Sequence, residues 1–155
     1  MSNVRPHKTM RNHTLALLSS ALALFAGCSS DLPKPSPNDP LIGCWSGEDF
    51  QPVLQRKAGW FMNRRPEGIF TIEFAATERG VALPIQTEEG RWTHHDGTYT
   101  TVTTRISGNP VDSKDPQYTD VYEVKSVAGG VMTYYHAKTK LTFTSKKVPC
   151  ERGAA

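Results

Sequence analysis

"GRWTHHDGTYTTVTTRI", residues 90–106, has the clearest strand and turn pattern in the sequence. It joins two runs rich in Thr, Val, Tyr and Trp, the residues that fit a pleated strand, around the dipeptide Asp96-Gly97. Asp-Gly readily adopts the positive φ angles of a tight hairpin turn, so the stretch predicts two antiparallel strands. From residue 41 onward no long segment has apolar residues at helical spacing, which favours an all-β domain.

Hydrophobic alternation predicts further strands on both sides of this hairpin. In "IFTIEFAA", Phe70, Ile72 and Phe74 share one face of a strand and polar residues separate them. Residues 51–65 fit no single pattern, and a loop, a short helix or a lid all remain open there. The sequence predicts about eight strands, near residues 41–47, 68–75, 80–86, 88–94, 98–106, 118–126, 130–136 and 140–148.

The N-terminal segment has the pattern of an export signal. Residues 1–14 carry three basic residues and no acid, and "LALLSSALALFAG" at 15–27 is apolar but too short to span a membrane. Translation from Met10 would leave the pattern complete. The stretch "FAGC" resembles the lipobox of bacterial lipoproteins, although Phe25 stands where that motif usually has Leu. An ordinary signal peptide with a nearby cysteine is the alternative.

The lipobox resemblance implies an address and an anchor. Cleavage would fall after residue 27, and Cys28 would carry diacylglycerol and an amide-linked acyl chain such as palmitate, which anchors the chain firmly. Ser29 follows the cysteine, whereas Asp at that position retains enterobacterial lipoproteins in the inner membrane. The resemblance therefore implies an outer-membrane lipoprotein that faces the periplasm, although sorting rules differ among bacteria.

Composition after the signal indicates a tether and a nearly neutral domain. Residues 28–40 contain four prolines and one large apolar residue, and we expect them to form an extended spacer before a domain at 41–150 and a tail at 151–155. Three of the 18 basic residues and none of the 15 acids lie in residues 1–27, so the mature chain balances 15 against 15. No nucleic-acid partner is expected from such a charge.

Two further cysteines frame the predicted strands. Cys44 lies in the first strand and Cys150 just after the last. An exported protein matures in an oxidising compartment, so we expect the two to pair, with two buried free thiols as the alternative. A disulfide needs Cα atoms within about 7 Å, and the first and last strands of an eight-stranded meander are neighbours when it closes. The sequence predicts an up-and-down antiparallel barrel with a disulfide at its seam.

A second resemblance supports that architecture. "LIGCWSGE", with Gly43 and Trp45, resembles the Gly-x-Trp start of lipocalins and of small lipocalin-like bacterial lipoproteins, and "GRWTHHDGTY" resembles a hairpin that recurs in lipocalin-like domains. The resemblance covers residues 41–148 and implies that Trp45 plugs the closed end, with Arg105 or Lys146 as candidates to stack on it. The helix and late-strand Arg motif of true lipocalins are missing, which favours a small lipocalin-like barrel.

Candidate chemistry is sparse. Neighbouring strand residues point to opposite faces, so we do not expect His94 with His95 to bind a metal, or Glu48 with Asp49 to act as a catalytic pair. The two histidines beside the turn are expected to be solvated, and His136 is expected to be an ordinary strand residue. We expect no metal, no cofactor and no enzymatic activity.

The segment "KAGWFMNRRPEG", residues 57–68, is the best candidate for a binding surface. It mixes aromatic with basic residues and could contact a ligand at the barrel mouth, a partner or a membrane, or else pack as core beneath a basic loop. The candidate contact residues are Trp60, Phe61, Arg64 and Arg65.

The leading hypothesis is a lipid-anchored barrel that binds a small apolar molecule or a partner protein. A lysozyme inhibitor of similar size is an alternative, although "ISGNP" is a poor match to the inhibitory loop of that class. An envelope structural or assembly factor is a further alternative.

Overall fold

The computed structural model describes residues 32–51 and 55–151, and this part of the chain is all-β. No helix within it is long and apolar enough to cross a membrane. The predicted signal, the lipobox-like stretch and Cys28 lie outside the described residues. The strands are β1 Gly43–Gln51, β2 Arg56–Arg64, β3 Ile69–Glu78, β4 Val81–Ala82, β5 Gln86–His95, β6 Thr98–Ile106, β7 Asn109–Pro110, β8 Thr119–Ala128, β9 Val131–His136 and β10 Leu141–Val148, with a short 3-10 turn, η2, at Pro116–Tyr118.

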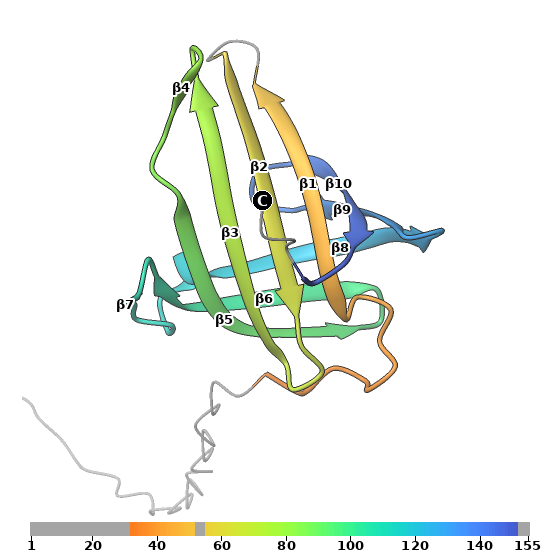
Figure 1. Cartoon of the computed structure of the whole chain (residues 1–155). Coiled ribbons are helices and arrows are strands. Elements are labelled where there is room, and N and C mark those ends of the chain that lie inside the picture. The colour runs from red at the N-terminus through yellow and green to blue at the C-terminus, as the bar shows by residue number, and fades with distance from the viewer. Residues whose placement is uncertain (1–31, 52–54, 152–155) are drawn as a thin grey trace, which may run out of the picture.

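The eight long strands form a closed antiparallel barrel (Figure 1). Each pairs with the next long strand along the chain, and β10 returns to pair with β1, while the two-residue strands β4 and β7 extend from β3 and β6. Closure satisfies the backbone groups that an open sheet would leave at its edges. The predicted up-and-down barrel is confirmed, and the central hairpin turns through Asp96 and Gly97 with φ of 48° and 74°.

The sequence prediction of strands was wrong at two places, one before β3 and one after it. Residues 56–64, which the sequence left open, form β2 and pair along their length with both β1 and β3. The predicted strand at 80–86 is reduced to β4, because the chain leaves the sheet before Pro84, which has no N–H to give to a ladder. Alternation in β2 was hard to recognise because Arg64 faces inward and Phe61 faces outward.

A disulfide links Cys44 in β1 to Cys150, just after the end of β10, beside the strand pair that closes the barrel. The two Cα atoms are 5.1 Å apart, and Cys44 lies opposite Val148 in the β1–β10 register. The predicted pairing is confirmed. Because the bridge closes a loop of 106 residues, the chain-entropy model assigns it about 4–5 kcal/mol of stabilisation.

One end of the barrel is filled by tightly packed side chains. Trp45 and Trp92 are fully buried there, and their indole nitrogens donate to the carbonyl oxygens of Leu41 at 2.9 Å and Arg65 at 3.0 Å. Trp45 therefore lies where the resemblance implied a plug. The cation over its ring is Lys147, 5.5 Å from the centroid, and neither Arg105 nor Lys146.

The segment before β1 lies against this filled end of the barrel, which we call the packed end (Figure 1). Pro35 and Asp39 are buried, although the sequence assigned both to an extended spacer. Asp39 accepts from the Leu41 backbone N–H and bonds His94 Nδ1, both at 2.9 Å, so the expectation of a solvated His94 was wrong. His94 turns inward beside Trp92, whereas the side chain of His95 is 82% exposed.

We predict that the seam disulfide carries much of the stability. Replacing Cys44 and Cys150 together with Ser, in a chain that also carries Cys28→Ser, should lower the free energy of unfolding by about 4–5 kcal/mol, because the unfolded chain regains the entropy of the opened loop. Urea unfolding followed by circular dichroism measures the change. An unchanged free energy of unfolding against the Cys28→Ser parent would contradict the assignment.

Candidate functional site

The barrel interior contains a cavity of about 100 Å³ above the packed end. Four of its lining residues come from pairs that face each other across neighbouring strands, namely Trp60 with Phe74 and Met62 with Ile72. The period-two alternation of the strands turns these side chains inward. The complete lining consists of Trp60, Met62 and Arg64 from β2, Ile72 and Phe74 from β3, Tyr99 from β6, Tyr122 from β8, Tyr134 from β9 and Phe143 from β10.

Aromatic rings form a continuous wall around one side of the cavity. Tyr99 stacks on Tyr122 with centroids 5.2 Å apart, and Tyr122 meets Tyr134 edge-on at 5.4 Å. Tyr134 stacks on Phe143, and Phe143 meets Trp60 edge-on, both at 5.7 Å. Such pairs contribute about 0.5–1.5 kcal/mol each beyond area burial, so they hold the wall in one arrangement.

Gly47 makes room for the largest ring in this wall. A Cβ at Gly47 would lie 2.1 Å from Cζ2 of Trp60 and 2.8 Å from the Thr144 carbonyl oxygen. Only glycine fits at this point, because the backbone of β1 and the Trp60 indole are already in contact. The absence of a side chain on β1 therefore positions Trp60 over the cavity.

Arg64 is the one strongly basic group in the cavity lining. Its residue is only 2% exposed, and Nε and Nη1 have no hydrogen-bond partner. The guanidinium carbon lies 4.4 Å from the centroid of the Tyr99 ring, and a desolvated contact of this kind contributes about 2 kcal/mol. Burial of a charge costs several kcal/mol, so this contact alone does not offset it.

The phenolic hydroxyl groups of the three cavity tyrosines are protonated and neutral. Burial raises the pKa of Tyr99 above its ordinary value, and the charge of Arg64 and its hydrogen bond with the Tyr99 hydroxyl only partly oppose that effect. Burial likewise raises the pKa of Tyr122 far above its usual range and that of Tyr134 to about 12. None of them is a phenolate at neutral pH, so they do not compensate the Arg64 charge.

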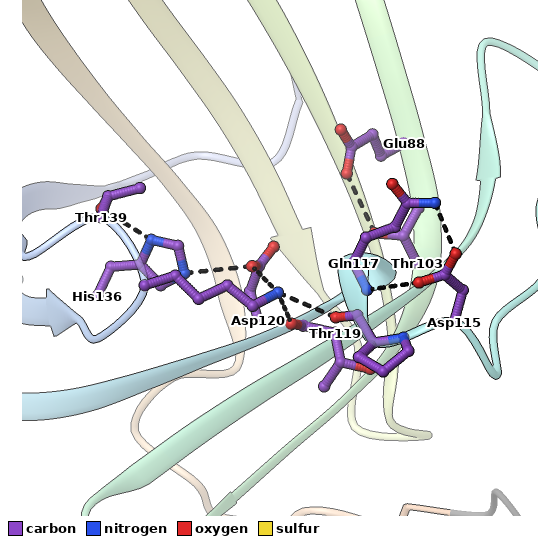
Figure 2. Close-up of polar contacts among 10 residues, drawn as sticks. Glu88, Thr103, Asp115, Gln117, Thr119, Asp120, His136 and Thr139 are labelled. Carbon is purple, nitrogen blue, oxygen red and sulfur yellow. Dashed lines mark hydrogen bonds and ion pairs between the residues drawn. The ribbon is translucent and has the colours of Figure 1, made fainter.

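A polar network lies beside the aromatic wall (Figure 2). His136 bonds Asp120 at 3.2 Å and Thr139 at 2.9 Å through its two ring nitrogens, and its ring stacks on Tyr122 with centroids 4.6 Å apart. Lys138 Nζ also contacts Asp120 at 3.2 Å and donates to the Pro116 and Thr119 carbonyl oxygens. Each polar group here has partners within the chain, so the network fixes η2 against the β9–β10 turn.

The four residues that we predicted from the sequence to form a mouth or partner surface do not lie together. Trp60 and Arg64 line the cavity, and Arg64, the last residue of β2, lies toward the packed end and away from the mouth. Phe61 lies on the outer face of the barrel, and Arg65 is exposed in the β2–β3 turn, where its carbonyl oxygen accepts from Trp92. Sequence reasoning did not propose Tyr99, Tyr122 or Tyr134 as site residues, although Tyr122 and Tyr134 lie in the alternating residues of 118–136.

No three His, Cys, Asp or Glu side chains lie together as a possible metal site within residues 32–51 and 55–151.

Comparisons with known proteins find likeness among solved structures. No protein-family model matches the chain, and no curated protein matches it. Among solved structures, the chain is similar to a lipoprotein, YedD, from Klebsiella pneumoniae subsp. pneumoniae, with 18% identity and a TM-score of 0.43 over 79% of this chain and 84% of that chain. The function proposed below is therefore drawn from the residues of this chain alone.

We predict that alkaline pH destabilises the barrel through its buried tyrosines. The unfolded chain releases phenolic protons near pH 10, whereas Tyr134 releases its proton only at about pH 12 in the folded state. The contribution of Tyr134 to stability is therefore complete below about pH 10 and is lost as the pH rises to about 12. Tyrosinate absorbance, recorded with circular dichroism, should show part of the phenolate forming only as the fold is lost.

The variant Tyr134→Phe is the control for this pH dependence. Its free energy of unfolding should fall less steeply between pH 10 and 12, because one shifted proton is missing. Formation of all phenolate near pH 10 with the circular dichroism unchanged would contradict the assigned burial.

Proposed function

We propose that this chain is a lipid-anchored lipoprotein of the bacterial outer membrane that faces the periplasm and binds a small apolar molecule inside its barrel. It acts as a binding protein in this proposal and carries out no chemistry of its own. The observation that carries it is the aromatic cavity of about 100 Å³, since an interior filled only by side chains would leave no such space.

The volume of the cavity limits the size of the ligand. Drug-sized ligands occupy pockets of about 300–1,000 Å³, whereas an apolar cavity of about 150 Å³ is enough to bind benzene. A space of about 100 Å³ is smaller than that benzene cavity, so it suits at most a single small ring or a short aliphatic chain. Trp60, Phe74 and Phe143 offer ring faces and edges to such a molecule.

The proposed location comes from the N-terminal sequence. A basic segment, a short apolar run and "FAGC" precede a proline-rich stretch, in the order that a lipoprotein signal and spacer require. The barrel begins within a few residues of that stretch, with Pro35 packed beneath it. This arrangement would hold the packed end of the barrel nearest the membrane and leave the cavity end facing away.

We predict that filling the cavity abolishes binding of a ring-sized probe. In the mature chain with Cys28→Ser, Ile72→Phe should place a ring in the space, so toluene should lose its saturation-transfer NMR signal. Thr71→Phe adds the same ring to the outer face of the same strand and should leave binding intact. Equal toluene binding by Ile72→Phe and the parent would contradict the cavity as the site, and no binding by the parent would contradict the function.

We also predict that Cys28 carries the membrane anchor. Cells that express the full chain and take up an alkyne-tagged palmitate should label the protein, and the protein should sediment with outer-membrane fractions. Cys28→Ser should abolish the label and release the protein into the soluble periplasmic fraction. Labelling that persists in Cys28→Ser would disprove the lipobox assignment, and sedimentation with the inner membrane would disprove the sorting assignment.

A further inference from the structure

We propose that Arg64 is an anion-binding group. The molecule bound in the cavity is then a small carboxylic acid with an apolar body, and its carboxylate group lies against Arg64. This inference rests on the proposed ligand-binding function and names the chemical class of the ligand. It begins from a cation that lines an otherwise apolar and aromatic cavity and is 98% buried, since only 2% of the residue is exposed.

Two N–H donor groups of the Arg64 guanidinium have no acceptor within the described residues. Nε and Nη1 are buried without a hydrogen-bond partner, and the ring of Tyr99 contacts the guanidinium through its face. A buried arginine in a purely structural role is normally paired, because unpaired buried donors destabilise the fold. Here the unpaired donors belong to a residue of the cavity wall, so an anion that enters the cavity can supply the missing acceptors.

Acidic groups elsewhere in the barrel are engaged in other contacts. Asp120 bonds His136 and Lys138, and Glu88 accepts from the Thr103 hydroxyl at 3.1 Å (Figure 2). The phenol groups around Arg64 are neutral, as their burial dictates. Nε and Nη1 of Arg64 have no acceptor within the described residues, so a ligand carboxylate can supply one, and N–H donors of arginine bind carboxylates strongly.

The position of Arg64 along β2 sets the orientation of the ligand. Arg64 pairs with Gly43 and Phe70 near the packed end, whereas Trp60 lies four residues further along β2, about 13 Å away at the rise of a strand. A carboxylate at Arg64 would leave the apolar part of the ligand between Trp60, Phe74 and Phe143. A benzoate-sized acid suits the cavity of about 100 Å³.

Isothermal titration with benzoate and with its neutral analogue benzamide tests the assignment. The protein is the complete mature chain with Cys28→Ser, and the variants are Arg64→Met, Arg64→Lys and the matched control Arg65→Met. Arg64→Met should weaken benzoate binding by about 10- to 100-fold, the usual effect of losing a hydrogen bond to a charged group. Arg64→Lys should restore part of the affinity, and Arg65→Met, which removes the same charge from the exposed turn, should match the parent.

Benzamide separates this inference from the function on which it rests. Benzamide should bind the parent more weakly than benzoate does, and Arg64→Met should reduce that difference. Equal affinities of the parent for benzoate and benzamide, or benzoate binding unchanged in Arg64→Met, would overturn the role of Arg64 while the cavity remained a binding site. Absence of binding by either compound, together with absence of toluene binding, would overturn the proposed function itself.

A folding control keeps the test decisive. Each variant should show the circular dichroism of the parent and a mass two hydrogens below that of the reduced chain, which reports the Cys44–Cys150 bond. If Arg64→Met does not fold, Arg64→Lys provides the test. Its affinity for benzoate should be lower than that of the parent. Its preference for benzoate over benzamide should persist.

Discussion

The pairing of β1 with β10 closes the barrel and so determines which side chains lie inside it. It converts a linear series of hairpins into a closed surface, and the disulfide from Cys44 in β1 to Cys150, just after β10, lies beside this pair. Closure turns one face of every long strand inward. Because the interior is then enclosed, each inward residue either packs against its neighbours or borders a space. The packed end and the cavity are two outcomes of the same geometry.

Those two outcomes follow from the size and charge of the inward residues. Toward one end, Trp45, Trp92 and Phe70 fill the barrel, and Asp39 with His94 fastens the preceding segment beneath them. Toward the other end the rings are held against one another along the wall and leave space between them. Arg64 lies between these regions, which places a positive charge at the inner end of an apolar cavity. This arrangement is the basis of the proposed binding site for a small anion with an apolar body.

Much of the fold could be predicted from local patterns. The hairpin around Asp96-Gly97, the alternation in residues 69–76 and the two terminal cysteines indicated strands, turns and closure. β2 escaped prediction because its inward and outward residues break the usual polarity, with Arg64 inside and Phe61 outside. The Asp39–His94 contact joins residues 55 positions apart, and only the assembled barrel brings them together. The cavity depends on how the rings of six strands pack, which no local pattern specifies.

The most direct measurement is a crystal structure of the mature chain soaked with 4-bromobenzoate, in which the anomalous signal of bromine locates the ring. The account predicts a single bromine peak within the barrel on the side of Trp60 and Phe143, with the carboxylate in contact with the Arg64 guanidinium. A cavity that contains no bromine at a saturating concentration, or a bromine that lies against Arg64 with the carboxylate pointing away, would contradict it.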